Sequence, residues 1–175
     1  MNYNIILLDS DASHANLIKE HLKNYSEYTI HVFTNVEACM SQLKELKPAV
    51  IFLDAELKHD SQTMREETQI MFRLKVHAPF AEIILYSGEE KLEIMLEQVK
   101  KGAHGFALKS TVTKIKAEML LLSAIRHYKL AKEARLYKKI NIALVILVIL
   151  IVTLAVLAYK FKIINDNVQG PFEGL

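Results

Sequence analysis

Residues 49–57 read AVIFLDAEL, an apolar run that ends at a single aspartate, Asp54. Apolar character that continues without alternation is typical of a strand covered on both faces, as in a parallel sheet. The other short runs rich in Ile, Val, Leu and Phe are Asn4–Leu8, Ile30–Phe33, Glu82–Tyr86 and Gly105–Leu108. Together with Val50–Leu53 they predict five strands.

Amphipathic stretches separate these strands, with apolar residues three or four positions apart, such as Ile18 and Leu22. The predicted helices are Ser13–Asn24, Val36–Leu46, Thr63–His77, Lys91–Lys101 and Thr113–Tyr128. Strands that alternate with helices predict an α/β fold with a doubly wound, five-stranded parallel sheet and helices on both faces. Such folds place their chemistry at the carboxyl ends of the strands.

Polar side chains follow four of the predicted strands. Asp9 and Asp11 follow the first strand, and Asp54 follows the third. Ser87 follows the fourth strand and Lys109 the fifth. Carboxylates are the ligands that Mg²⁺ prefers, a carboxylate can act as a nucleophile, and a lysine can pair with a transferred phosphoryl group. We therefore expect a site for a divalent cation and a phosphoryl group at this edge.

Four segments carry a family resemblance in the same order and spacing: IILLDSD (5–11), AVIFLDAEL (49–57), EIILYSG (82–88) and GAHGFALKS (102–110). With them, residues 1–128 resemble the receiver domain of two-component response regulators, a flavodoxin-like fold. The resemblance implies that Asp54 is the phospho-acceptor. It also implies that Mg²⁺ is held by Asp9, by Asp54 and by the backbone carbonyl of Glu56, whose side chain need not take part. Asp11 is a further candidate ligand.

The same resemblance assigns the remaining positions. Ser87 and Lys109 would contact the phosphoryl group, and Phe106 falls where the family carries an aromatic residue that changes rotamer on activation. Two positions depart from the family pattern. Ser10 replaces the usual second acid, so we expect weakened Mg²⁺ binding. Ser110 replaces the usual proline after the lysine, so we expect a loop of different shape.

Residues 140–159 contain no charged side chain, and fourteen of the twenty are Leu, Ile or Val. Twenty helical residues span roughly 30 Å, the thickness of a bilayer core, so this run predicts a single transmembrane helix. Residues 110–139 carry 8 Lys and Arg against 2 Asp and Glu, and this excess predicts that the N-terminal part faces the cytoplasm. The predicted regions are a receiver-like domain (1–128), a basic helical juxtamembrane linker (129–139), the transmembrane helix (140–159) and a short tail (160–175).

Composition excludes several classes of protein. Residues 1–109 carry 12 Lys and Arg against 16 Asp and Glu, which argues against nucleic acid as a partner. Cys39 is the single cysteine, so the chain is not a disulfide scaffold. No two histidines have the spacing of a helical metal motif, so we expect surface or half-buried roles for them. The histidines are His14, His21, His31, His59, His77, His104 and His127.

These observations lead to one main hypothesis about function and one alternative. The main hypothesis is a membrane-anchored, single-domain receiver in a phosphorelay, which accepts phosphate on Asp54 from a histidine kinase or phosphotransfer protein. It would signal by binding an effector near the membrane, contact membrane lipids, and catalyse at most weak self-phosphorylation and autodephosphorylation. The family resemblance implies a bacterial inner membrane. The alternative is a pseudo-receiver that takes no phosphate and acts as a membrane-tethered scaffold. A flavodoxin-like oxidoreductase is disfavoured because the first loop is acidic.

Overall fold

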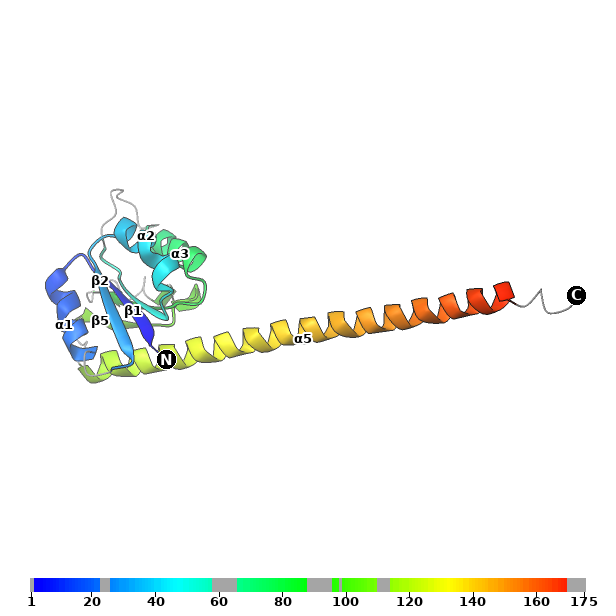
Figure 1. Cartoon of the computed structure of the whole chain (residues 1–175). Helices are drawn as coiled ribbons and strands as arrows, with labels where there is room; N and C mark the ends of the chain where they lie inside the picture. The colour runs from blue at the N-terminus through cyan, green and yellow to red at the C-terminus, as the bar shows by residue number, and fades with distance from the viewer. Residues whose placement is uncertain are drawn as a thin grey trace, which may run out of the picture. The chain divides into compact units, whose positions relative to one another are not determined.

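The computed structural model describes residues 2–22, 26–57, 66–87, 96–97, 99–109 and 114–169. Within these ranges the chain forms a five-stranded parallel sheet in the order β2-β1-β3-β4-β5 (Figure 1). The strands are β1 (Tyr3–Leu8), β2 (Tyr28–Phe33), β3 (Val50–Asp54), β4 (Glu82–Ser87) and β5 (Gly105–Leu108). The predicted sheet is thus confirmed, and the strands that the structure describes begin or end within two residues of the expected positions.

The core strand β3 is buried at all five positions, as its continuous apolar run requires. It lies between β1 and β4, with Leu8 opposite Leu53 and Asp54 opposite Tyr86. The strand β2 lies at one edge, and all six of its residues are only partly buried. Because all five strands are parallel, the polar residues at the ends of β1, β3, β4 and β5 emerge at the same end of the sheet, the carboxyl end.

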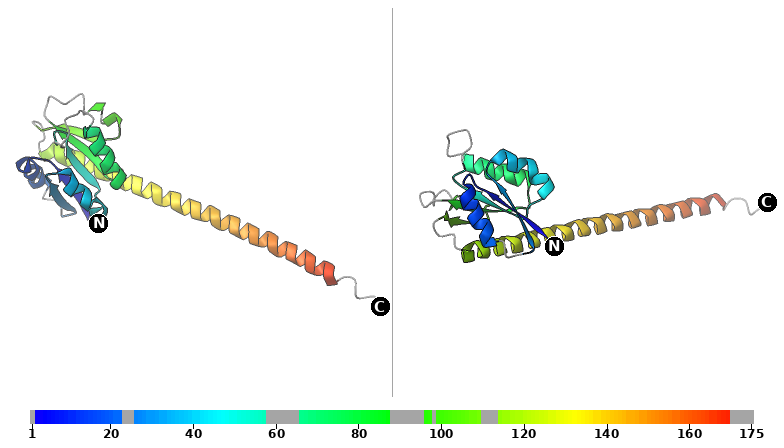
Figure 2. Two further views of the ribbon diagram at one scale, coloured as in Figure 1. Left: turned by 90° about the horizontal axis from the view of Figure 1, so that it is seen from above. Right: turned by 60° about the vertical axis from the view of Figure 1, so that its left-hand side comes forward.

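The described helices are α1 (Ala12–Leu22), α2 (Val36–Leu46), α3 (Glu66–His77) and α5 (Lys114–Gln169). Two buried apolar clusters show how they cover the sheet. The helices α2 and α3 pack on one face, through residues such as Leu43 and Leu74. The helix α1 and the first turns of α5 pack on the other, through residues such as Ile18 and Leu121. The views in Figures 1 and 2 show the same two layers of helix around the sheet.

Both ends of α2 are capped by hydrogen bonds that the local sequence provides. The Asn35 side chain accepts a hydrogen bond of 2.8 Å from the amide of Ala38, as an N-cap residue does. Lys47 has a left-handed conformation, with φ 46°, and its amide donates to the carbonyl oxygen of Leu43. Pro48 follows at once and cannot continue a helix. These caps explain why α2 matches its predicted bounds.

The helix α5 is described as continuous from Lys114 to Gln169, and no glycine or proline lies in this range. Among the helices that the structure describes, it is the one long and apolar enough to cross a membrane, judged by length and composition. Its large apolar side chains from Ile140 to Ile164 are exposed. The chain divides into two compact units, Met1–Lys132 and Glu133–Leu175.

Some expected features fall on residues that the structure does not describe. Of the predicted helix Lys91–Lys101, the structure describes residues 96, 97 and 99–101; the first four of these are helical, and Lys101 lies in a turn. The bond between Lys109 and Ser110 also lies outside the described residues. The predicted helix Ser13–Asn24 begins one residue earlier, because Asp11 caps it, and is described to Leu22.

Candidate functional site

Four polar side chains meet at the carboxyl edge of the sheet because four adjacent strands end there. Asp9 directly follows β1, Asp54 ends β3, Ser87 ends β4, and Lys109 directly follows β5. The three acidic or hydroxyl residues are almost fully buried, with exposed fractions of 0% for Asp9, 2% for Asp54 and 0% for Ser87. Buried polar side chains at a sheet edge require partners, and these partners define the site.

Asp54 is held through one of its two carboxylate oxygens. Its Oδ1 accepts a hydrogen bond of 2.9 Å from the amide of Glu56 and lies 2.9 Å from Lys109 Nζ. Its Oδ2 is buried and has no hydrogen-bond partner among the described residues. An unpartnered carboxylate oxygen in a buried position is costly, so this atom is available to a cation or to an incoming electrophile.

The side chain of Glu56 joins the same network. Its Oε2 lies 3.3 Å from Lys109 Nζ, and its Oε1 accepts a hydrogen bond of 3.3 Å from the hydroxyl of Ser87. The carboxylate therefore occupies the space between the serine and the lysine. The resemblance required no role for this side chain, yet the structure places it in contact with both Ser87 and Lys109. Sequence reasoning missed the contact because the turn after β3 directs the side chain back over the strand ends.

Asp9 is held from the side of α1. Its Oδ1 accepts a hydrogen bond of 2.8 Å from the amide of Asp11, and its Oδ2 lies 2.7 Å from His14 Nδ1. The imidazole of His14 packs 5.2 Å from the ring of Tyr86, centroid to centroid. No sequence pattern predicts this position of His14, because the residue comes from the first turn of a helix and is five positions from Asp9.

Three other expected residues have clear positions. Asp11, the further candidate ligand, is exposed, and its Oδ1 accepts hydrogen bonds from the amides of Ser13 and His14, so it caps α1. Ser10, where a second acid was expected, is exposed. Phe106 is partly buried and packs against the cluster under α2 and α3. The structure shows one position for its ring and does not test a change of rotamer.

The two buried carboxylates, Asp54 and Asp9, have pKa values shifted in opposite directions. Burial raises the pKa of Asp54 to about 6, and the negative charge of Asp9 adds to this, although hydrogen bonds from Glu56 and Lys109 oppose it. Burial would also raise the pKa of Asp9, but hydrogen bonds from His14 and from the Asp11 amide outweigh burial and bring it to about 2. Burial acts to lower the pKa of Lys109, yet its contact with Asp54 produces a net rise. The lysine is therefore a fixed cation at neutral pH.

These residues fit a divalent magnesium ion in the chemistry of their donors. Asp9 and Asp54 supply hard oxygen ligands on adjacent strands, and no described residue is a hydrogen-bond partner of the buried Oδ2 of Asp54. The carbonyl oxygen of Glu56 follows in the adjoining turn. Three features reduce the fit. Ser10 contributes no charge, and His14 already occupies one oxygen of Asp9. Asp11 is engaged in helix capping.

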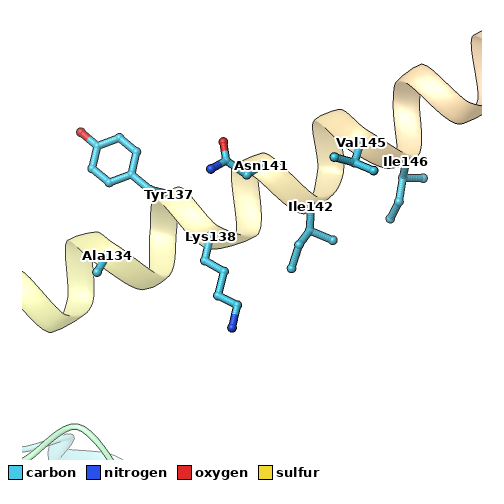
Figure 3. Close-up of a pocket in the computed structure, with 7 residues that line it drawn as sticks. All are labelled: Ala134, Tyr137, Lys138, Asn141, Ile142, Val145 and Ile146. Carbon is cyan, nitrogen blue, oxygen red and sulfur yellow. The ribbon is translucent and has the colours of Figure 1, made fainter.

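A surface hollow also occurs beside α5. It is lined by Ala134, Tyr137, Lys138, Asn141, Ile142, Val145 and Ile146 (Figure 3). All seven side chains come from this helix. Because a ligand pocket needs walls from more than one element to enclose its ligand, we assign no binding function to this hollow.

Comparison with known proteins agrees with this geometry. The family model described as the response regulator receiver domain matches residues 5–120. No curated protein matches the chain. Among solved structures, a response regulator receiver domain protein from Clostridium thermocellum is 19% identical, with a TM-score of 0.63, over 74% of this chain and 98% of that one.

Two further solved structures have similar folds. A CheY-like response regulator receiver domain protein from Methanospirillum hungatei is 15% identical, with a TM-score of 0.62, over 74% of this chain and 98% of that one. A protein described as an adenylate cyclase from Rhodopirellula baltica is 18% identical, with a TM-score of 0.68, over 79% of this chain and 98% of that one. At these identities the likeness establishes the fold alone.

Proposed function

This chain belongs to the family of response regulator receiver domains, and we propose that it accepts a phosphoryl group on Asp54 while its apolar helix holds it in a membrane. Receiver domains bind Mg²⁺ in an acidic pocket and interact with histidine kinases or phosphotransfer proteins. The observation that carries the proposal is the buried Asp54 carboxylate, whose Oδ1 is held by Lys109 and whose Oδ2 has no hydrogen-bond partner within the described part of the chain.

The proposed reaction is an in-line transfer to Asp54. Its pKa of about 6 leaves most of the carboxylate ionised at neutral pH, so Oδ2 can act as the nucleophile. The new bond joins Oδ2 to phosphorus while the bond from phosphorus to the donor breaks, and the donor atom retains that electron pair. With acetyl phosphate as donor, acetate leaves. The product is an acyl phosphate on Asp54.

The side chains around Asp54 support this transfer in distinct ways. Lys109, which contacts Oδ1 in this structure, would pair with a phosphoryl oxygen instead, and its charge would offset the charge that develops there. The hydroxyl of Ser87, which donates to Glu56 in this structure, can donate to a phosphoryl oxygen when Glu56 moves away. When bound by Asp9, Asp54 and the Glu56 carbonyl, Mg²⁺ would neutralise negative charge on the phosphoryl group. We expect no turnover beyond slow self-phosphorylation and autodephosphorylation.

The membrane part of the proposal is supported by length, composition and charge. Residues 140–159 are uncharged, and their large apolar side chains are exposed. The cations of residues 126–139 precede this run, which favours a single-pass protein with the receiver on the cytoplasmic side, in the inner membrane of a bacterium. These cations would also contact anionic lipid headgroups. An effector close to the membrane would then bind in response to a change around the phosphorylated Asp54.

The direct test uses the full-length chain in lipid nanodiscs with Mg²⁺ and acetyl phosphate. We expect intact-mass analysis to show the addition of one phosphoryl group, which Asp54→Ala abolishes. Glu97→Gln, which changes an exposed acid that pairs with Lys101, should be labelled like the parent chain. Absence of an adduct on the parent chain, while an active receiver in the same assay is labelled, would overturn the proposal.

The competing function is a pseudo-receiver that serves as a membrane-tethered scaffold. Two observations favour it, the exposed Ser10 in place of an acid and the contact between His14 and Asp9. A calorimetric Mg²⁺ titration separates the two functions. A phospho-accepting receiver should bind Mg²⁺ in a way that Asp9→Ala removes, and Ser10→Asp should tighten this binding by about tenfold, because affinity rises with the number of charged ligands. A pseudo-receiver should show no binding in the parent chain.

A further inference from the structure

Three side chains of metal-ligating type meet at the edge of the sheet opposite to Asp54. Glu82 is the first residue of β4, His104 directly precedes β5, and His127 lies on α5. One ligand atom from each residue lies within 4.8 Å of the others. All three belong to the compact unit Met1–Lys132. Residues that are far apart in the chain are thus brought together by the strand register and by the packing of α5.

The two carboxylate oxygens of Glu82 face different imidazoles. His127 Nδ1 lies 2.7 Å from Oε1, and His104 Nδ1 lies 3.5 Å from Oε2. The two imidazole rings are 5.5 Å apart, centroid to centroid. In a tetrahedral zinc site with bonds of about 2.0–2.2 Å, ligand atoms are roughly 3.4 Å apart. The three residues would reach this geometry with movements of about an ångström.

A fourth side chain fixes one of the ligands. His104 Nε2 lies 3.1 Å from the hydroxyl oxygen of Ser123 on α5, so this nitrogen is engaged and Nδ1 faces Glu82. Ligating histidines commonly have their second ring nitrogen held in this way. The Glu82 and His104 side chains are 10% and 14% exposed, whereas His127 is 64% exposed. The cluster therefore has an anchored interior and a side open to solvent, where water can complete the coordination.

We infer that Glu82, His104 and His127 form a binding site for a divalent transition metal such as Zn²⁺. Imidazole nitrogen suits Zn²⁺ and is a poor ligand for Mg²⁺, so this site differs in chemistry from the acidic site at the other end of β4. Two histidines and one carboxylate are a known zinc ligand set, with water in the fourth position. The bound ion would link β4, the segment before β5 and α5.

Such a link has a consequence for stability that can be measured. A metal that binds the folded chain and not the unfolded chain raises the free energy of unfolding as its concentration exceeds the dissociation constant. The site spans a strand, a loop and a helix, so the metal opposes separation of α5 from the sheet. The gain depends on all three ligands and is independent of Asp54.

The test is a metal titration of the full-length chain in detergent, stripped of metal with chelator and kept in excess Mg²⁺. Competition with a chromophoric zinc indicator should show one Zn²⁺ bound per chain. Loss of a residue that only hydrogen-bonds to a metal ligand weakens metal binding by about 10–100-fold. His127→Gln removes a ligand itself, so it should weaken Zn²⁺ binding by at least that much. Because His127 is mostly exposed, this variant should keep its fold, which circular dichroism can verify. Zn²⁺ should raise the melting temperature of the parent chain but not of the variant.

Two matched variants locate the metal. His77→Ala removes an exposed histidine at the end of α3 that is not one of the three ligands, and it should bind Zn²⁺ like the parent chain. Asp54→Asn alters the acidic site and should also leave Zn²⁺ binding unchanged. Co²⁺ added in place of Zn²⁺ should give visible absorption bands that His104→Ala removes. The inference is overturned if the parent chain binds no Zn²⁺ at micromolar concentrations, or if His127→Gln binds it as tightly as the parent.

Discussion

Lys109 Nζ lies 2.9 Å from Asp54 Oδ1, although the two residues belong to the ends of β5 and β3, which are not neighbours in the sheet. The lysine side chain reaches across the end of β4 and passes 5.8 Å from the centre of the Tyr86 ring. The contact places a cation on Oδ1 of Asp54, whereas Oδ2 has no hydrogen-bond partner among the described residues. Asp54 and Asp9, the two buried carboxylates of the site, consequently differ in their effect on the free energy of unfolding.

The first prediction concerns Asp54→Asn. The folded chain holds a proton on Asp54 up to about pH 6, whereas the ordinary value is 3.8, so the folded state binds more protons between these values. Its contribution to the free energy of unfolding is therefore largest below pH 3.8 and falls as the pH rises through 6. In the absence of Mg²⁺, Asp54→Asn should raise the free energy of unfolding at pH 7.5 by an amount on the order of 1–3 kcal/mol.

Urea denaturation at several pH values checks this result. The gain should be largest at pH 7.5 and should shrink as the pH falls toward 4. Added Mg²⁺ should stabilise the parent chain and leave the variant unchanged. A variant less stable than the parent at pH 7.5 would show that the Lys109 contact outweighs the cost of burying the charge.

Asp9→Asn should act with the opposite sign. The pKa of Asp9 is lowered to about 2 in the folded chain, from an ordinary value of 3.8. Its stabilisation is present above pH 3.8 and is lost as the pH falls toward 2. We expect Asp9→Asn to lower the free energy of unfolding at pH 7 by about 1–2 kcal/mol. The same denaturation series measures it, and a gain in stability at pH 7 would contradict the assigned role of His14.

Lys47→Gly should stabilise the fold. Lys47 is exposed and has a φ of 46°, a conformation that costs a residue with a Cβ atom roughly 1–2 kcal/mol. Glycine removes this cost but adds freedom to the unfolded chain, so the net gain should be about 1 kcal/mol. The readout is the urea midpoint, with Lys44→Gly within α2 as a control that should destabilise. No gain for Lys47→Gly would mean that its side chain makes a compensating contact.

Charge placed in the apolar run should release the chain from membranes in a stepwise manner. Each arginine at the centre of a span costs about 2.5–3.5 kcal/mol, whereas each Leu, Ile or Val contributes about 0.3–0.6 kcal/mol in favour. With fourteen such residues, Leu150→Arg alone should remain inserted, and the double variant Leu147→Arg/Leu150→Arg should lose most of its membrane fraction. Carbonate extraction of membranes measures this fraction. A parent chain that is fully extracted by carbonate would contradict membrane anchoring.

The sheet and the ends of its strands could be predicted because they depend on local pattern. The continuous apolar run Val50–Leu53 requires burial on both faces, and parallel strands align their carboxyl ends. These two facts place Asp9, Asp54, Ser87 and Lys109 at one edge, where the structure brings them together. The predicted bounds of α2, Val36–Leu46, match the structure, where Asn35 and Lys47 cap the helix.

The contacts that depend on tertiary packing could not be predicted. The pairing of His14 with Asp9 depends on where α1 begins and how its first turn faces the sheet. The position of the Glu56 carboxylate depends on the turn after β3. The meeting of Glu82, His104 and His127 depends on the register of β5 and the docking of α5, neither of which leaves a spacing in the sequence.

The central position of β3 determines where the folded chain opens last. Its amides pair with β1 on one side and β4 on the other, and all its side chains are buried. Hydrogen exchange at these amides requires the opening of the whole sheet, whereas β2 at the edge can exchange through local fraying. Deuterium uptake in β3 thus reports the global free energy of folding without added denaturant.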